Sequence, residues 1–324
     1  MVNSLLQVTP KSKIQITNSF GYADGAGAQV QRILSLVAFS KKHELDFVLN
    51  PIRKAEIQPI DNLTTHEELQ ANIDELNSWL HHEFDCKNGN FGINVIEVKN
   101  TYDLVTSLLQ LVFSRFLTND NDVVGFSLLD GYFETKSNPE TWSLLTKCDS
   151  TVKRNSAVSR FVHIHFRLST FSSSSDRNVP MSYYKNIMKE LETEARNKKL
   201  DLFFVVHTDF RGNLTDRTLL LEHAVPQSLN YWIALGLLTE DYEVNEGLIC
   251  HARESLNLLL SEFSNVSFYN EKSWVSQWKA MSSADYLVAS KSSFSLIGGI
   301  MNHSGIVYVP KSWSLKMPGW RGRD

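Results

Sequence analysis

An apolar strand is predicted at Val162-His163-Ile164-His165-Phe166-Arg167, just before the polar run Leu168-Ser169-Thr170-Phe171-Ser172. Arg167 falls at the carboxyl end of this strand, and open α/β sheets bind their ligands outside the carboxyl ends of their strands. A planar guanidinium can hold a diphosphate through paired hydrogen bonds, which the point charge of a lysine does less well. The stretch therefore predicts a nucleoside diphosphate site, with a solvated or ion-paired surface Arg167 as the alternative.

A serine-rich turn farther along the chain points to the same chemistry. The residues Tyr286-Leu287-Val288-Ala289 predict a buried strand, and Ser290-Lys291-Ser292-Ser293-Phe294-Ser295 follows as a turn that opens a helix. The N–H groups and the positive dipole end at a helix start favour an anion, and small hydroxyl side chains can add hydrogen bonds. The turn is thus a second candidate for contacts with the phosphate groups.

Strands and helices alternate along the whole chain, which predicts an α/β fold with parallel sheets. In the first half we expect strands over 13–20, 46–49, 92–98 and 123–129, and helices over 29–43, 67–84 and 104–117. In the second half we expect strands over 161–168, 201–209, 286–289 and 306–309, and helices over 180–197, 225–238 and 253–263. The pattern weakens over 136–155, so we expect two doubly wound domains, 1–150 and 151–324.

Composition narrows the classes of protein to consider. The 324 residues have 42% hydrophobic and 21% charged residues and a formal net charge of −4, which is ordinary for a globular protein and argues against a nucleic-acid partner. Cys86, Cys148 and Cys250 form no CxxC pair, so we expect reduced thiols. The sequence contains no evident signal peptide or long apolar span, which predicts a cytoplasmic protein, or else a trimmed Golgi or endoplasmic reticulum enzyme.

Several short motifs occur in the same order as the motifs of a known enzyme family. They are His165-Phe166-Arg167, Met181-Ser182-Tyr183-Tyr184-Lys185, Val206-His207-Thr208-Asp209, Ser290-Lys291-Ser292-Ser293-Phe294-Ser295 and Val309-Pro310-Lys311-Ser312-Trp313, with Asp24-Gly25-Ala26-Gly27-Ala28-Gln29 near the first strand. Together they resemble the GT-B fucosyltransferases, in particular the α-1,2-fucosyltransferase family and its protein-O- and α-1,6-fucosylating relatives. The likeness is to that family's His-x-Arg motif, its paired tyrosines, its Asn-Ser-[ST]-Phe-Ser turn and its Gly-rich first loop.

The resemblance implies a GT-B fold, with two Rossmann-like domains and the active site in the cleft between them. It implies that Arg167 neutralises the leaving β-phosphate, that His165 shapes the donor site, and that Ser292, Ser293, Phe294 and Ser295 contact the phosphate or ribose. Asp209 matches a residue suited to a base or ribose hydroxyl, and its alternative role is that of a turn former. Gly25, Gly27 and Gln29 would form the acceptor-side loop.

The general base that would deprotonate the acceptor hydroxyl is predicted from position alone. Asp24 lies in the Gly-rich loop after the first strand, where a desolvated carboxylate could accept a proton. The alternative is that Asp24 caps the following helix. His163 and His165 alternate on one strand, but no third ligand accompanies them, so we expect no metal and no cofactor besides the nucleotide sugar.

The chain departs from the family pattern at three places. Leu168-Ser169-Thr170 stands where many relatives have a second Arg, a Gly and an Asp; Leu296-Ile297 replaces a Trp pair; and Gly25-Ala26-Gly27-Ala28 lacks the Asn. These departures leave a UDP-sugar donor, such as UDP-xylose, open beside GDP-fucose. They also leave open a non-catalytic module that binds nucleotide or glycan, whereas a Rossmann oxidoreductase or a hydrolase lacks its own motifs here. A glycosyltransferase acting on a glycan or glycoconjugate is the function that the sequence favours.

Overall fold

The chain folds into two compact α/β units. The computed structural model describes residues 14–18, 25–53, 55, 66–84, 87–88, 94–98, 106–107, 110, 124–128, 158–167, 179–208, 255–313, 317 and 319–324. The first unit contains Met1–Tyr22, Ala28–Arg53 and Ile73–Cys148, and the second contains Ala23–Gly27, Lys54–Asn72 and Asp149–Asp324. The predicted domain boundary near residue 150 lies in a stretch outside the described residues and stays a prediction.

The first unit is built on a parallel sheet in the order β3-β2-β1-β5-β4. Its strands are β1 (Ile14–Asn18), β2 (Asp46–Leu49), β3 (Lys87–Asn88), β4 (Asn94–Val98) and β5 (Val124–Leu128). Helix α2 (Ala26–Lys42) buries Val30, Ile33, Leu34 and Val37, which recur at helical spacing and form one apolar face. Two reciprocal hydrogen bonds join β1 to the end of β2: Asn18 Nδ2 donates to Asn50 O (2.7 Å), and Asn50 N donates to Asn18 Oδ1 (2.8 Å).

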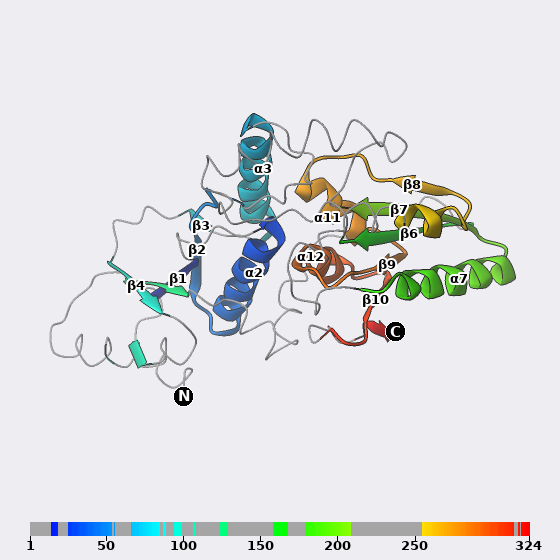
Figure 1. Ribbon diagram of the computed structural model, residues 1–324. Coiled ribbons are helices and arrows are strands. Elements are labelled where there is room, and N and C mark those ends of the chain that lie inside the picture. Colours follow the sequence, from blue (N-terminus) through cyan, green and yellow to red (C-terminus); the bar gives the residue numbers. More distant parts are fainter. Residues whose placement is uncertain are drawn as a thin grey trace. The chain divides into compact units, whose positions relative to one another are not determined.

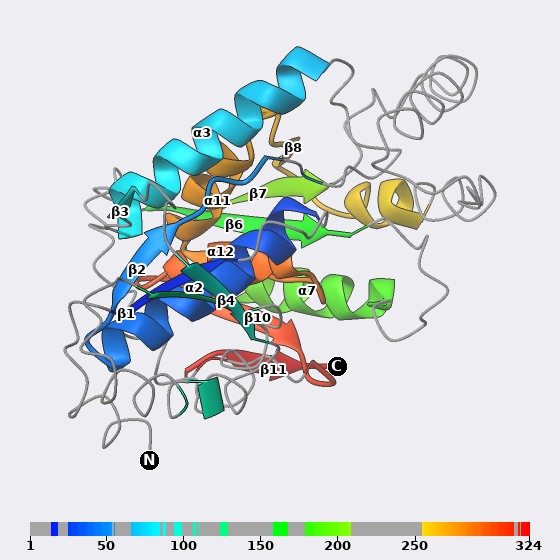
Figure 2. The ribbon, with the colours of Figure 1, turned by 90° about the vertical axis from the view of Figure 1, so that its left-hand side faces the viewer.

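The second unit carries a six-stranded sheet in the order β11-β10-β9-β6-β7-β8, and every strand pair in it is parallel. Its elements are β6 (Ser159–Phe166), α7 (Met181–Lys198), β7 (Asp201–Thr208), β8 (Val266–Phe268), α11 (Trp274–Ser282), β9 (Tyr286–Val288), α12 (Ser293–Met301), β10 (Ile306–Pro310) and β11 (Arg321–Arg323). Figure 1 labels all of them except β11, which is labelled in Figure 2. From β6 the chain first builds outward through β7 to β8, and it then returns to the other side of β6 through β9. This is the doubly wound order of Rossmann folds, and the direction of winding reverses between β6 and β9.

Alternate residues of β6 face two different helix layers. Val162, Ile164 and Phe166 belong to a fully apolar core that they share with α7, in which Phe166 packs on Tyr184 at a ring distance of 4.1 Å. On the other face His165 stacks on Phe294 of α12, with ring centroids 5.5 Å apart. Figure 2 shows β6 and β7 side by side and pointing the same way, as their register His165↔His207 requires. Helices therefore cover both faces of the sheet, which is why β6 reads as an almost continuous apolar run.

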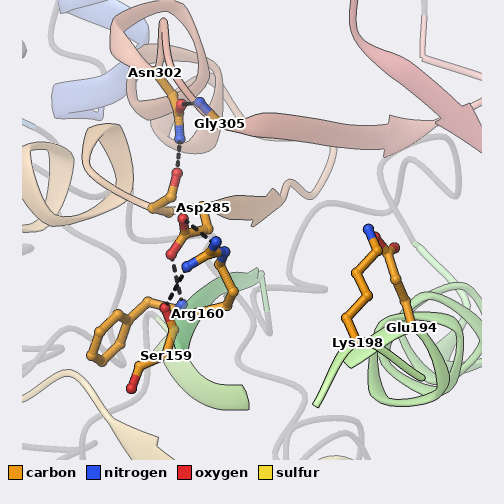
Figure 3. A network of polar contacts seen from close by, with 9 residues as sticks. Ser159, Arg160, Glu194, Lys198, Asp285, Asn302 and Gly305 are labelled. Atoms are coloured by element: carbon orange, nitrogen blue, oxygen red, sulfur yellow. Dashed lines mark hydrogen bonds and ion pairs between the residues drawn. The ribbon is translucent and has the colours of Figure 1, made fainter. Parts of the chain in front are cut away.

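A polar network lies at the edge of the sheet where its strands begin (Figure 3). Asp285, just before β9, accepts a hydrogen bond from the backbone N of Phe161 (3.0 Å) and lies 3.7 Å from Arg160 Nε. Asn302, after α12, donates to the backbone O of Ala284 (3.0 Å) and accepts from the N of Gly305 (2.7 Å). These contacts fix the starts of β6, β9 and β10 relative to one another.

The predicted α/β class with two parallel, Rossmann-like sheets is confirmed. The strand predicted over 46–49 is observed without change, and those over 13–20 and 161–168 are observed as Ile14–Asn18 and Ser159–Phe166. Strands β3, β8 and β11 were not predicted, because strands of two or three residues have too little periodicity to detect. The helix predicted over 225–238 lies outside the described residues, as does most of the one predicted over 104–117.

Candidate functional site

The reversal of winding in the second unit places Arg167 and Ser290 at the same edge of its sheet. Arg167 directly follows β6, and Ser290 comes two residues after β9, the neighbouring strand. Arg167 is half-buried, whereas Ser290 is fully buried. Ligands of open α/β sheets bind at such a reversal, outside the carboxyl ends of the strands. The sequence signals at 162–167 and 286–295 thus converge on one place in the fold.

His165 contacts two residues of the serine-rich turn, Ser290 and Phe294. Its Nδ1 lies 2.7 Å from the Oγ of Ser290, and its ring stacks on Phe294 with an interplanar angle of 24°. Phe294 is itself anchored, because Trp278 Nε1 donates a hydrogen bond to its backbone O (3.0 Å). His165 is only 2% exposed, so the side chains around it restrict the orientation of its ring.

The serine-rich turn is the N-terminal cap of α12. The Oγ of Ser292 accepts from the backbone N of Phe294 (3.2 Å), as an N-cap side chain does. Ser295 is fully buried, and its hydroxyl lies 3.0 Å from the backbone O of Ser290 and 3.1 Å from that of Ser292. Ser295 therefore shapes the turn from within, while half-buried Ser293 lies on its outer side.

The paired tyrosines at the start of α7 support the same turn from the other face of the sheet. Tyr183 OH donates to the backbone O of Ala289 at 3.0 Å, directly before the turn. Burial raises the pKa of Tyr183, so its hydroxyl keeps its proton and stays a donor. Tyr184 packs against Phe166, one residue before Arg167. The two tyrosines thus fix both strand ends that form the candidate site.

Gly27, in the first turn of α2, lies against the start of α12. Gly27 belongs to the second unit, and a Cβ added to it would lie 2.6 Å from Phe294 N and 2.8 Å from Phe294 Cα. Only a glycine permits that approach, because real Cβ atoms do not come so close to backbone. Gly27 was predicted to lie in an acceptor-side loop, and its contact in the structure is with the predicted donor turn.

A pair of buried histidines, His163 and His207, lies on the neighbouring strands β6 and β7. His163 Nδ1 is 2.8 Å from His207 Nε2, and the ring of His207 stacks on Tyr269 at 4.7 Å. Burial lowers the pKa of His163 to about 4, because its charged form would lose hydration. In the sequence His207 stood out only as part of the motif Val206-His207-Thr208-Asp209, and Tyr269 was not singled out. A lone aromatic residue after a three-residue strand gives no periodic signal.

The remaining predicted residues lie partly outside the described chain. Asp24 and Asp209 are outside it, so their proposed roles stay predictions. Gly25 and Gln29 are half-buried near the start of α2. Within the described residues no group of three or more His, Cys, Asp or Glu could hold a metal ion. Among those same residues, no helix combines the length and the apolar character needed to cross a bilayer.

No protein-family profile matches the sequence, and no curated protein is significantly similar to it. Solved structures with a distant likeness include the NodZ α-1,6-fucosyltransferase soaked with GDP-fucose, with 8% identity, 90% of this chain and 92% of that chain covered, and a TM-score of 0.39. The structure of POFUT1 in complex with GDP-fucose is 10% identical, with 97% of this chain and 98% of that chain covered and a TM-score of 0.36. A trehalose-phosphate synthase from Burkholderia vietnamiensis is 8% identical, with 95% of this chain and 59% of that chain covered and a TM-score of 0.26. The fold assignment rests on the strand order of the chain itself.

Proposed function

We propose that the protein is a glycosyltransferase that moves a sugar from a nucleoside diphosphate donor to a hydroxyl group of a glycan acceptor. The observation that carries the proposal is the convergence of half-buried Arg167, at the end of β6, with the capped start of α12 at the point where the winding reverses. A guanidinium and the N–H groups of a helix start are complementary to a diphosphate. Donor binding is accordingly assigned to residues 151–324 and acceptor binding to 1–150.

The proposed reaction needs positive charge at this point of the fold. The acceptor oxygen attacks the anomeric carbon of the sugar, while the bond from that carbon to the β-phosphate oxygen breaks and its electron pair stays on the phosphate. Negative charge therefore grows on the leaving group in the transition state, and a preorganised Arg167 stabilises that state more than the bound donor. Because Arg167 and α12 supply this charge, we propose a reaction without a divalent ion, and with inversion at the anomeric carbon.

The proton of the acceptor hydroxyl must move to a base, and Asp24 remains the proposed one. We propose that Asp209 binds the nucleobase or the ribose hydroxyls of the donor. The proposed contacts of the phosphate or ribose are Ser292, Ser293, Phe294 and Ser295. GDP-fucose is the proposed donor, on the motifs around His165 and Ser292. A UDP-sugar donor would use the same phosphate contacts. Only the protein groups that contact the nucleobase and the sugar would differ.

Donor hydrolysis by the purified protein tests the function directly. We expect nucleotide release from GDP-fucose that persists in EDTA, and little release from GDP-mannose, UDP-xylose, UDP-galactose or UDP-rhamnose. Release from a uridine sugar alone would keep the chemistry and replace the donor. Absence of both turnover and binding with every donor would contradict the proposed function.

The role of Arg167 has a matched control on the same strand. Arg167→Ala should lower transfer by about 100-fold or more, the effect of removing one preorganised donor to a developing anion. Arg160→Ala removes an arginine from the opposite end of β6, where Arg160 lies beside Asp285, and should leave turnover of the folded protein near normal. Equal turnover by both variants would show that Arg167 does not meet the leaving group.

A further inference from the structure

Residues 319–324 lie along the outer edge of β10 and contact helices on both faces of the sheet. Strand β11, inside this segment, pairs with β10 in parallel, and Figure 2 shows the two strands side by side. On one face Arg323 Nη2 donates to Glu190 Oε1 of α7 at 2.7 Å. On the other face the ring of Trp320 lies against Gly299 of α12. The segment, which we call the strap, therefore joins β10, α7 and α12.

Trp320 contributes more to the attachment of the strap than its ion pair does. The side chains of Arg323 and Glu190 are 41% and 47% exposed, and ion pairs that open to solvent add little stability. Trp320 is half-buried, and the burial of a large aromatic side chain is a major source of packing energy. Its Cη2 and Cζ2 atoms lie 2.8 Å from the position that a Cβ at Gly299 would take. Only a glycine lets the ring come so close to the helix backbone.

Helix α12 depends on such contacts because its own sequence supports it weakly. It has nine residues, and helices of this length do not persist alone in water. Two of the nine are Gly298 and Gly299, and glycine is a poor helix former. Gly298 admits α11, since a Cβ there would lie 2.7 Å from Met281 Cβ, as Gly299 admits Trp320 of the strap. Contacts with α11 and with the strap thus both hold α12.

The start of α12 is the serine-rich turn to which the proposed function assigns the diphosphate. In this first turn Leu296 N donates to Ser292 O at 3.0 Å, and Phe294 N donates to Ser292 Oγ at 3.2 Å. Gly299 follows Ser295 by four residues, which is about one helical turn. A shift or loosening of α12 at Gly299 therefore reaches the turn through the hydrogen bonds of the same short helix.

We propose that Trp320 is a positioning residue, and that docking of the strap holds α12 so that its first turn keeps the geometry that a diphosphate requires. Because coupling between two sites is reciprocal, a diphosphate that binds the ordered turn also favours the docked strap. The phosphate part rests on the proposed function, whereas the coupling of Trp320 to α12 does not.

A double-mutant cycle tests the contact itself. Gly299→Ala should lower the stability of the wild type, because the added methyl group displaces the ring of Trp320. In the Trp320→Ala background the same change should lower the equilibrium constant of unfolding by about fivefold, since alanine is the better helix former. Urea unfolding of the four proteins measures both effects. Equal effects of Gly299→Ala in the two backgrounds overturn the proposed coupling.

Amide hydrogen exchange tests the positioning of the turn without any ligand. Trp320→Ala and Gly299→Ala should each speed exchange of the Phe294 and Leu296 amides by about tenfold, and exchange in α7 should stay unchanged. Gly299→Ala undocks the ring without removing it, so the test does not depend on one variant. Trp313→Ala, which removes another half-buried indole after β10, should match the wild type. Unchanged exchange at the turn in both strap variants overturns the positioning role.

Binding of GDP tests the role toward phosphate. At a temperature where all the proteins are folded, Trp320→Ala should bind GDP at least about fivefold more weakly than the wild type, the lower end of coupling between linked sites. Trp313→Ala should bind it normally. Faster exchange at the turn with unaltered GDP affinity overturns the role toward phosphate. If the wild type binds neither GDP nor UDP, the proposed function and the phosphate role both fail, while the cycle and the exchange rates still decide the coupling of Trp320 to α12.

Discussion

Replacing His163 by Gln should remove a large part of the pH dependence of stability. The His163 side chain is 7% exposed on β6, and its Nδ1 lies 2.8 Å from His207 Nε2. Glutamine does not titrate, yet its amide can still form a hydrogen bond with His207. The variant therefore removes the ionisation of His163 and retains a polar partner for the buried neighbour.

The magnitude follows from the pKa of His163 in the two states. Burial lowers it from 6.5 in the unfolded chain to about 4 in the folded protein. Above the unfolded pKa neither state binds the proton, and the contribution to stability is complete. As the pH falls from 6.5 toward 4, only the unfolded state gains the proton, so the free energy of unfolding decreases. The loss attributable to His163 is about 2 kcal/mol at about pH 5 and about 3 kcal/mol below the folded pKa.

Urea unfolding of the wild type and of His163→Gln at about pH 7.5 and about pH 5 measures this loss. The free energy of unfolding should fall by about 2 kcal/mol less in the variant, with equal m-values, because all other titrating groups are common to both proteins. His82→Gln, which replaces an exposed histidine of α3 (His66–Phe84) by the same residue, is the matched control for the substitution itself. The reasoning is refuted if the wild type and His163→Gln lose the same free energy between the two pH values.

Three further substitutions probe the packing of the second unit. Gly27→Ala would bring a Cβ within 2.6 Å of Phe294 N, so thermal unfolding should show a loss of about 1–3 kcal/mol rather than the gain that alanine usually gives a helix. Ser292→Ala should lower stability by about 1 kcal/mol through loss of the N-cap of α12, and Ser292→Asn should recover most of it, as measured by urea midpoints. Gly305→Ala would place a Cβ 2.2 Å from the backbone O of Ala284, so we expect a loss of more than about 3 kcal/mol, and a stable soluble variant would contradict the described packing.

The regular elements of both units could be predicted because their sequences are locally consistent. The apolar positions of α2 recur at helical spacing, and β6 and β7 are apolar runs of the length that a doubly covered parallel strand requires. The short strands could not be predicted in this way. Residues 266–268 and 321–323 become strands only because β7 and β10 present free edges to them, which is a property of the assembled sheet.

The candidate site could likewise be predicted only in part. Arg167 and the serine-rich turn could be recognised from their place after predicted strands and from the chemistry of their side chains. The partners of His165 could not, because Ser290 lies 125 positions away in the chain and meets it only through the pairing of β6 with β9. The contacts of Tyr183 with Ala289 O and of Gly27 with Phe294 likewise join residues that are distant in the chain.

The sequence by itself determined that this chain builds parallel α/β sheets and carries a guanidinium and a hydroxyl-rich turn at strand ends, because periodicity and residue chemistry are local properties. Only the tertiary structure decided that β9 lies beside β6, so that Arg167, His165 and the start of α12 share one edge of a sheet. Only the tertiary structure, again, gave Ser290 its contact with His165 and gave His163 its buried partner His207. The hydrogen bonds and the burial of these side chains involve residues that are distant in the chain. They therefore depend on which strands the fold brings together.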